Sequence, residues 1–336
     1  MKTYRILFGL IALELLASVE LPAQVSPWVW QNPLPQGLAL YEIRILNENT
    51  IIAAGEWGAI VRTPNRGTTW NVHHLSEYLP EYSLLVLTMF FVSENKGWIG
   101  TDRRLFVTTN GGVTWDEQNL PDTIRERSVS SVHFINENMG WALAGIYANR
   151  YLLFTSNSGI SWSVISKIEM PQLASIVFLT DSVGYGWYPW RLGNASNRIY
   201  RTSDGGRTWT PHDLEFSLGV TKLFFLNESI GWLCGTNGVI LKTTDSGRSW
   251  VSQNSGVATT INSIFFVNAD TGWATSEGGL ILRTANGGST WEEQQTPVSQ
   301  SLQAIHFLNS RVGWVTGSRG VLLETVNGGS SWNEKS

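Results

Sequence analysis

The chain has 336 residues, of which 17 are tryptophan and 33 are glycine, and its formal net charge is −4. This aromatic and glycine-rich composition suits an all-β fold, and such folds often extend as one domain beyond the usual length. The chain has no basic excess with which to neutralise phosphates, which argues against nucleic acid as its main partner.

The first 23 residues have the pattern of an export signal. Lys2 and Arg5 form a positive start, residues 6–17 form a short apolar stretch, and Ala23 is a small residue before a cleavage point. The apolar stretch is shorter than the roughly 20 residues that span a bilayer. We therefore expect a signal peptide over residues 1–23, a mature chain over residues 24–336, and a periplasmic or secreted location. Any membrane association would then be indirect, through a partner.

One eight-residue pattern, here called the box, recurs seven times in the mature chain. It has Thr first, Asn or Asp third, Gly fifth, Thr or Ser seventh and Trp last. The boxes cover residues 63–70, 108–115, 155–162, 202–209, 243–250, 284–291 and 325–332. Successive box tryptophans are 41 to 47 residues apart. A period of this length is typical of propeller blades.

A second marker runs in phase with the boxes. An apolar residue, usually Phe, is followed seven residues later by an aromatic residue that a Gly precedes, as in Phe225 and Trp232. Short apolar runs bounded by Gly, Asn, Asp and Ser predict four strands, A to D, in each repeat. The sequence therefore predicts an all-β fold, a seven-bladed β-propeller of four-stranded blades, over residues 24–336.

The box lies in the expected turn between strands C and D. We expect its Asn or Asp to accept hydrogen bonds from the backbone two residues on, its Gly to take a positive φ, and its Trp to bury its ring. All seven repeats share these groups, which indicates a structural role. The structural residues are Asn65, Trp70, Asn110, Trp115, Asn157, Trp162, Asp204, Trp209, Asp245, Trp250, Asn286, Trp291, Asn327 and Trp332.

The residue just before each box is often basic, as in Arg62, Arg201, Lys242 and Arg283. We expect these side chains to lie at exposed strand ends and to pair with nearby acids, a kind of contact that usually contributes little to stability.

The boxes resemble the Asp-box of bacterial neuraminidase (BNR) repeats. The fuller pattern, with Gly231-Trp232 in strand B and Thr243-Thr244-Asp245-Ser246-Gly247 in the turn, is similar to the photosystem II stability and assembly factor family of propellers. The resemblance covers nearly all of residues 28–336, and residues 28–35 resemble the start of exported bacterial members. It implies the propeller fold. In photosynthetic organisms it also implies a role in photosystem II assembly, through binding of a membrane subunit.

Residues 28–32 also resemble the starts of strand D at Trp115 and Trp250. A short strand D begins at Trp332, at the other end of the chain. We expect residues 28–32 to lie beside or overlap that strand, so that both chain ends close the ring and cover its edge.

The repeats differ in length only in two kinds of loop, the D–A connections into blades 2 and 3 and the B–C loops of blades 3 and 4. Consecutive antiparallel strands turn on alternate sides, so these loops share one face of the disc, here called the loop face. The A–B and C–D turns share the other face, here called the box face. Loops on a rigid scaffold often carry binding function, although these could also be ordinary solvated loops.

The inserted segments combine tyrosine, tryptophan and arginine, the residues that carry much of the binding energy at interfaces. We predict a partner-binding surface that consists of Tyr78, Tyr82, Arg125, Arg127, Tyr147, Arg150, Tyr188, Trp190, Arg191 and Arg198.

Other candidate sites are weaker. His133 and His306 share a slot before the strand-A Phe that is mainly apolar in the other blades, so we expect strand histidines rather than ligands. Cys234, the only cysteine, is expected in the core. The sequence has no zinc-ligand spacing and no nucleotide-binding loop, so we predict no metal and no cofactor.

The leading hypothesis is an exported, non-catalytic scaffold that binds a protein or peptide partner through the loop face. The alternative is a sialidase-like carbohydrate-active enzyme, or a glycan-binding propeller, that uses the same face or the central channel. We find no counterpart of the sialidase arginine motif. A pair of buried carboxylates with shifted pKa values would favour the enzyme.

Overall fold

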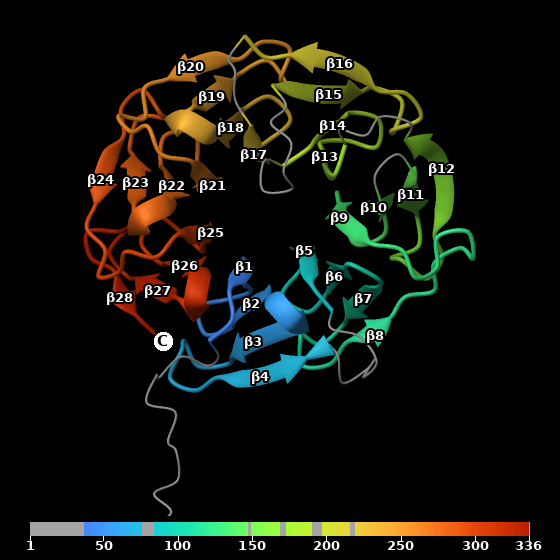
Figure 1. The fold of residues 1–336 in the computed structure, drawn as a ribbon, viewed down its shortest axis with the longest axis horizontal. Helices are drawn as coiled ribbons and strands as arrows, with labels where there is room; N and C mark the ends of the chain where they lie inside the picture. The colour runs from blue at the N-terminus through green and yellow to red at the C-terminus, as the bar shows by residue number, and fades with distance from the viewer. Residues whose placement is uncertain are drawn as a thin grey trace, which may run out of the picture. The chain divides into compact units, whose positions relative to one another are not determined.

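The computed structural model describes residues 37–75, 84–146, 149–168, 173–189, 197–215 and 219–335. These described residues belong to one compact unit. Its described strands make seven antiparallel sheets of four strands each. Figure 1 shows these sheets as blades arranged in a ring. The predicted seven-bladed β-propeller is therefore confirmed.

Each blade is built from four strands in chain order. Blade 1 has β1 (Leu40–Ile45), β2 (Ile51–Gly55), β3 (Ala59–Thr63) and β4 (Asn71–His74), and blade 2 has β5 (Val86–Phe91), β6 (Gly97–Thr101), β7 (Leu105–Thr108) and β8 (Asp116–Glu117). Blade 3 has β9 (Val129–Phe134), β10 (Gly140–Ile146), β11 (Asn149–Thr155) and β12 (Ser163–Ile168), and blade 4 has β13 (Ser175–Phe178), β14 (Gly184–Trp187), β15 (Arg198–Thr202) and β16 (Thr210–Asp213). Blade 5 has β17 (Val220–Phe225), β18 (Gly231–Gly235), β19 (Ile240–Thr243) and β20 (Val251–Gln253). Blade 6 has β21 (Ile261–Phe266), β22 (Gly272–Ser276), β23 (Ile281–Thr284) and β24 (Glu292–Gln294), and blade 7 has β25 (Leu302–Phe307), β26 (Gly313–Gly317), β27 (Leu322–Thr325) and β28 (Asn333–Glu334).

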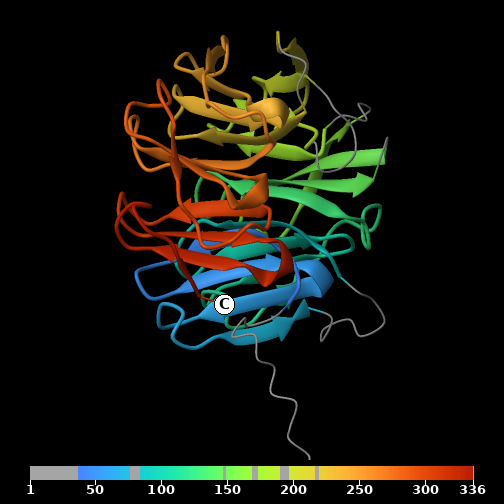
Figure 2. The same ribbon diagram turned by 60° about the vertical axis from the view of Figure 1, so that its left-hand side comes forward.

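The order of strands fixes two faces of the ring. The first strand of each blade lies nearest the centre and the fourth lies at the rim (Figure 1). Because neighbouring strands are antiparallel, the turns between them gather at two opposite faces, as the turned view in Figure 2 shows. None of the helical turns in the described ranges has the length and hydrophobicity of a membrane-spanning segment.

The blades are joined by a repeating aromatic contact. The second-strand aromatic residue of one blade stacks on the first-strand Phe of the next, as Trp232 does on Phe266 with ring centres 3.5 Å apart. The box Trp of that next blade, Trp291, meets the same Phe edge-on at 5.9 Å. A Cβ on Gly272 would lie 2.5 Å from the Phe266 ring, so Gly is needed before the second-strand aromatic residue. Stacked and edge-on aromatic pairs add to the free energy gained from burial alone.

Blade 1 departs from this pattern and meets blade 7 differently. Ile45 takes the place of the Phe, and Trp314 of blade 7 contacts Trp70 of blade 1 edge-on at 5.8 Å. The core between these two blades includes Ile43, Ile51 and Leu322. The fourth strand of blade 7 is β28, from the C-terminal end of the chain. Residues 28–32, which we expect beside it, and the signal peptide over residues 1–23 lie outside the described residues.

Candidate functional site

The box turns are closed by hydrogen bonds that repeat in all seven blades. In blade 6, the Thr284 hydroxyl accepts from the backbone N–H groups of Asn286 (3.3 Å) and Gly288 (2.9 Å) and donates to the Asn286 side chain (3.0 Å). The Asn286 side-chain oxygen accepts from the N–H of Thr290 at 2.9 Å. This donor is four residues on, not two as the sequence suggested. Two successive positive φ values, at Gly287 and Gly288, turn the chain back toward the Asn side chain.

The two box aspartates are acceptors inside these turns. Asp245 accepts hydrogen bonds from the backbone N–H and the hydroxyl of Ser249. These bonds, followed by those from Thr243 and Arg248, outweigh the opposing effect of burial and lower the pKa of Asp245 to about 2. Asp245 is therefore ionised at neutral pH and holds the turn, and it does not carry the proton that a general acid needs.

The residue before the box reaches across to a neighbouring group that is not an acid. The Arg62 side chain donates to the Gly111 carbonyl of the next blade's box at 2.8 Å. The Lys242 ammonium lies 5.2 Å from the centre of the Trp232 ring, which is opposite it on the neighbouring strand. The expected pairing with surface acids is therefore wrong for these two residues. The partners are therefore an aromatic ring on strand B of the same blade for Lys242, and a carbonyl in the next blade's box for Arg62.

On the loop face, four blades share one tight turn between their second and third strands. The turns are Glu56–Gly58, Thr236–Gly238, Glu277–Gly279 and Ser318–Gly320, in blades 1, 5, 6 and 7. Blades 2, 3 and 4 depart from it, with connections at residues 102–104, 147–148 and 188–197. Three consecutive blades therefore differ from the rest on the same face, and these are the blades over which the sequence places the inserted loops.

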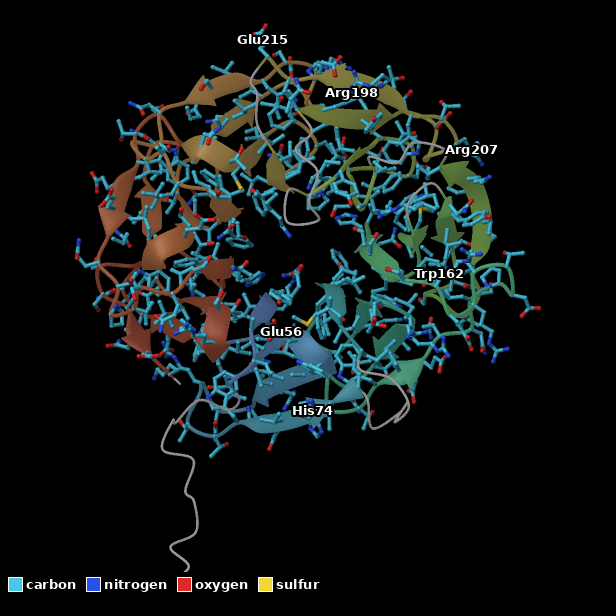
Figure 3. All side chains as sticks on the ribbon, in the orientation of Figure 1. Glu56, His74, Trp162, Arg198, Arg207 and Glu215 are labelled. Atoms are coloured by element: carbon cyan, nitrogen blue, oxygen red, sulfur yellow. The ribbon has the colours of Figure 1, made fainter. Side chains whose placement is uncertain are left out.

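Two of the predicted binding arginines have internal partners in the structure. Arg150 is buried, donates to the Leu173 carbonyl at 2.7 Å, and lies 5.7 Å from the centre of the half-buried Tyr188 ring. Burial lowers the pKa of Arg150. Arg198 forms a bidentate ion pair with Asp213, at 2.5 and 2.9 Å. This bond raises the pKa of Arg198 and lowers that of Asp213. Figure 3 labels Arg198 on blade 4.

The other predicted residues are placed less deeply or not described. Arg125 is exposed, and Arg127 is half-buried and donates to the Thr123 carbonyl at 3.2 Å. Arg125, Arg127, Arg150, Tyr188 and Arg198 therefore lie on blades 3 and 4 and on the connection between blades 2 and 3. Five predicted residues lie outside the described part of the chain: Tyr78, Tyr82, Tyr147, Trp190 and Arg191.

Arg104 is a loop-face residue that the sequence analysis missed. It is buried, and its guanidinium pairs with Glu117 (2.9 Å) and Glu126 (3.2 Å). Arg104 and Arg198 both stand four residues before the box Thr, a position that is apolar in the four blades with the regular turn: Ala59, Val239, Leu280 and Val321. A position-by-position comparison of the repeats could have found this difference.

A cavity of about 350 Å³ lies at the centre of the ring and is lined by the first strands of all seven blades. Its charged lining residues are Glu42, Arg44 and Lys222. Arg44 is fixed by hydrogen bonds to the carbonyls of Ile43 and Met89, both at 2.7 Å, and by an ion pair with Glu42 at 3.3 Å. Glu42 is the one carboxylate among the lining residues that the structure describes.

His133 and His306 also line this cavity. Nδ1 of His133 accepts from the N–H of Phe178 (3.3 Å), and Nδ1 of His306 accepts from the N–H of Ile45 (3.4 Å). Burial, and then the positive charges of Arg44 and Lys222, lower the pKa of His133 to about 4 and that of His306 to about 3. Both imidazoles are therefore neutral at pH 7. In the described part of the chain, no three His, Cys, Asp or Glu side chains gather as a metal site would require.

Cys234 belongs to the core, as its position in strand B indicated. The residue is fully buried, and burial raises the pKa of its thiol to about 12. A thiol with so high a pKa is not a nucleophile at neutral pH.

Solved structures with the same fold include, among others, two groups of proteins. One is a structure described as YCF48 bound to D1 peptide, with 18% identity and a TM-score of 0.71 over 88% of this chain and 95% of that one. YCF48 from Cyanidioschyzon merolae is 20% identical, with a TM-score of 0.72 over 87% of this chain and 97% of that one.

The other group contains glycoside hydrolases. The GH74 xyloglucanase from Xanthomonas campestris is 11% identical, with a TM-score of 0.71 over 90% of this chain and 55% of that one. This chain therefore spans about half of that enzyme. At these identities the likenesses show the fold alone.

The sequence comparisons are more specific. A search of curated proteins finds no match. The family model described as photosynthesis system II assembly factor YCF48 matches residues 79–222, 206–296 and 286–336. These segments cover all but the first blade, and the chain belongs to this family.

Proposed function

We propose that this protein is an exported, non-catalytic scaffold that binds an extended segment of a protein partner on its loop face, over blades 2 to 4, and so assists the assembly or stability of an envelope complex. One observation carries the proposal. Three consecutive blades depart from the regular turn on one face, whereas the box turns on the other face repeat in all seven. The peptide bound to a YCF48 of the same fold supports this type of partner.

The loop face is suited to binding because described residues at the bases of its connections are held by internal bonds. Arg104 and Arg198 bind acidic side chains, and Arg150 binds a backbone carbonyl. These bonds order the side chains at the bases of the connections before a partner arrives, which lowers the entropic cost of association. The exposed Arg125 and the half-buried Tyr188 are then available as contacts. An arginine fork suits carboxylates and peptide carbonyls, and a tyrosine ring offers a large contact area with few rotatable bonds.

The central cavity gives less support to the carbohydrate-active alternative. Hydrolysis of a glycosidic bond normally uses two carboxyl groups, roughly 5–10 Å apart. Glu42 is ion-paired with Arg44, and the other described lining side chains of the cavity are basic, neutral or apolar. This composition favours a binding role over glycoside hydrolysis.

A selection from a phage library of random 12-residue peptides, on the immobilised mature chain, tests the proposal. We expect the protein to enrich a related set of peptides. A fluorescein-labelled synthetic copy of the most enriched peptide then gives a dissociation constant by fluorescence polarisation. Arg125→Glu should weaken binding about tenfold or more, since it reverses an exposed charge of the surface.

The matched control is Arg248→Glu, which reverses an exposed charge on the box face. It should leave the affinity unchanged. If the peptide binds the wild type and Arg125→Glu with equal affinity, or if only Arg248→Glu loses affinity, the binding surface lies elsewhere.

Export has its own test. We expect the full chain, expressed in a bacterial host with an outer membrane, to be recovered outside the cytoplasm with Gln24 as its first residue. Intact mass and N-terminal sequencing of the recovered protein measure this directly. A cytoplasmic protein that retains residues 1–23 would contradict the export proposal and leave the binding proposal standing.

A further inference from the structure

Trp57 is an exposed aromatic residue at the tip of a tight turn. It lies in the turn between β2 and β3 of blade 1, on the loop face, and 59% of its surface is exposed. Its backbone has φ 56° and ψ 25°, in the left-handed region. Among the described non-glycine residues with positive φ, Trp57 is the one aromatic residue.

The geometry of this turn does not favour tryptophan. Trp57 and Gly58 both have positive φ, as the two central residues of a type I′ hairpin turn do, and such turns prefer Asn-Gly or Gly-Gly. The equivalent residues in the other regular blades are Asn237, Gly278 and Arg319. A bulky side chain in the left-handed region is sterically costly, and residues held in this way concentrate at ligand-binding sites.

The turn that carries Trp57 is anchored on both sides. The Glu56 carboxylate accepts from the Tyr41 hydroxyl (2.8 Å) and from the N–H of Ala39 (3.1 Å). Figure 3 shows Glu56 near the inner strands of blade 1. A Cβ on Gly58 would lie 3.2 Å from Leu75 and 3.4 Å from Leu84. The turn therefore packs against both ends of the inserted connection into blade 2, at residues 76–83.

We infer that Trp57 is the apolar anchor of the peptide-binding surface, and that it receives a large aliphatic or aromatic side chain of the bound segment. The inference rests on the proposed function and extends its surface from blade 2 to blade 1. Leu85, which follows Leu84, is also partly exposed and adds apolar surface on the same side. Exposed tryptophans on rigid supports are frequent hot spots of recognition because they bury a large area at a small entropic cost.

The test uses Trp57→Asn, which installs the residue that blade 5 has at this position and removes the ring without straining the turn. The matched control is Arg319→Asn, at the same exposed position of blade 7. The probe is the labelled 12-residue peptide most enriched on the wild-type chain, together with copies in which each large apolar residue is replaced in turn by Ala.

We expect Trp57→Asn to raise the dissociation constant at least tenfold, and Arg319→Asn to leave it within twofold. We also expect that one of the Ala-substituted peptides binds the wild type more weakly than the parent peptide does. The Trp57→Asn variant should bind that same peptide and the parent peptide with equal affinity. This pattern indicates a direct contact between Trp57 and the replaced side chain. The thermal midpoint of Trp57→Asn should be equal to or higher than that of the wild type.

Three results would overturn the inference. If the wild type binds the peptide and Trp57→Asn binds it equally well, Trp57 is not part of the surface and the proposed function stands. A clear fall in the thermal midpoint of Trp57→Asn, without the pairwise effect, would make the ring a structural element. If the wild-type chain enriches no peptide at all, both the inference and the proposed function fail.

Discussion

One slot in the first strand of each blade shows how single residues adapt a repeated position. His133 and His306 occupy the slot that holds Phe90, Phe224 and Phe265 in other blades. The phenylalanines pack with neighbouring rings, as Phe224 does with Phe265. The histidine rings also pack on rings, His133 on Phe90 at 4.9 Å and His306 on Phe265 at 4.6 Å between ring centres. Each histidine in addition accepts a backbone N–H from the following blade. Both histidines lie in first strands, as the sequence predicted. The slot therefore joins adjacent blades through ring packing, and at the two histidines through a hydrogen bond as well.

These histidines should make the stability of the protein depend on pH. Their pKa values, about 4 for His133 and about 3 for His306, lie below the ordinary value of 6.5. At a pH between the lowered pKa values and 6.5, the histidines of the unfolded chain bind protons that those of the folded chain do not. Their contribution to the free energy of unfolding is therefore complete above about pH 6.5 and decreases as the pH falls toward 4. Because both rings are only half-buried by surface area, we expect about 1–3 kcal/mol from each. Urea unfolding at pH 7.5 and pH 4.5 measures the change in free energy.

The double variant His133→Phe/His306→Phe distinguishes the contribution of the histidines to this pH dependence from that of the carboxylates, which also titrate in this range. Phe already fills the slot in three blades, so the variant should fold. The decrease in unfolding free energy between the two pH values should be smaller for the variant than for the wild type. Equal decreases would show that the histidines do not cause the effect.

At the scale of the element, the box hydroxyl is the centre of each turn. The Thr284 hydroxyl satisfies two backbone N–H groups and binds Asn286, and Thr284 is buried. Thr284→Val keeps the shape and leaves those groups without a partner, which should cost about 1–3 kcal/mol of unfolding free energy. Thr284→Ser, which keeps the hydroxyl, should cost less. Chemical denaturation of both variants decides this, and an equal loss in both would mean that the hydroxyl contributes no more to stability than the methyl group does.

The fold was predictable at this scale because the information is local. The box and the Gly-aromatic pair each fix one turn or one contact, and seven copies in phase leave few architectures open. The partner of an individual side chain was less predictable. Arg62 binds a carbonyl 49 residues away, and Arg150 is buried although it belongs to an inserted segment. Both outcomes depend on packing between blades, which repeat spacing does not encode.

At the scale of the whole molecule, an ion-pair cluster lies at the junction of blades 7 and 1, where the ring closes. Glu324 of blade 7 is buried and lies between two cations, with Arg66 of blade 1 at 2.5 Å and Lys335 at 3.0 Å. The other blades have a basic or apolar residue at the position of Glu324. The sequence alone does not reveal the partner of Glu324, because Arg66 and Glu324 are 258 residues apart.

Replacing Glu324 should therefore weaken the closure of the ring. In Glu324→Gln, the side chain keeps its shape and loses the charge that holds Arg66 and Lys335. Removing one member of a buried ion pair is strongly destabilising, but both cations here are about one-third exposed and can be solvated in part. We expect a loss of about 1–3 kcal/mol in unfolding free energy, measured by guanidinium denaturation at pH 7.5. Glu292→Gln, an exposed acid of the neighbouring blade 6, is the control and should change it by less than about 0.5 kcal/mol. Equal effects of the two substitutions would mean that the charge of Glu324 does not stabilise the junction, and that the apolar and aromatic contacts between blades 7 and 1 close the ring without it.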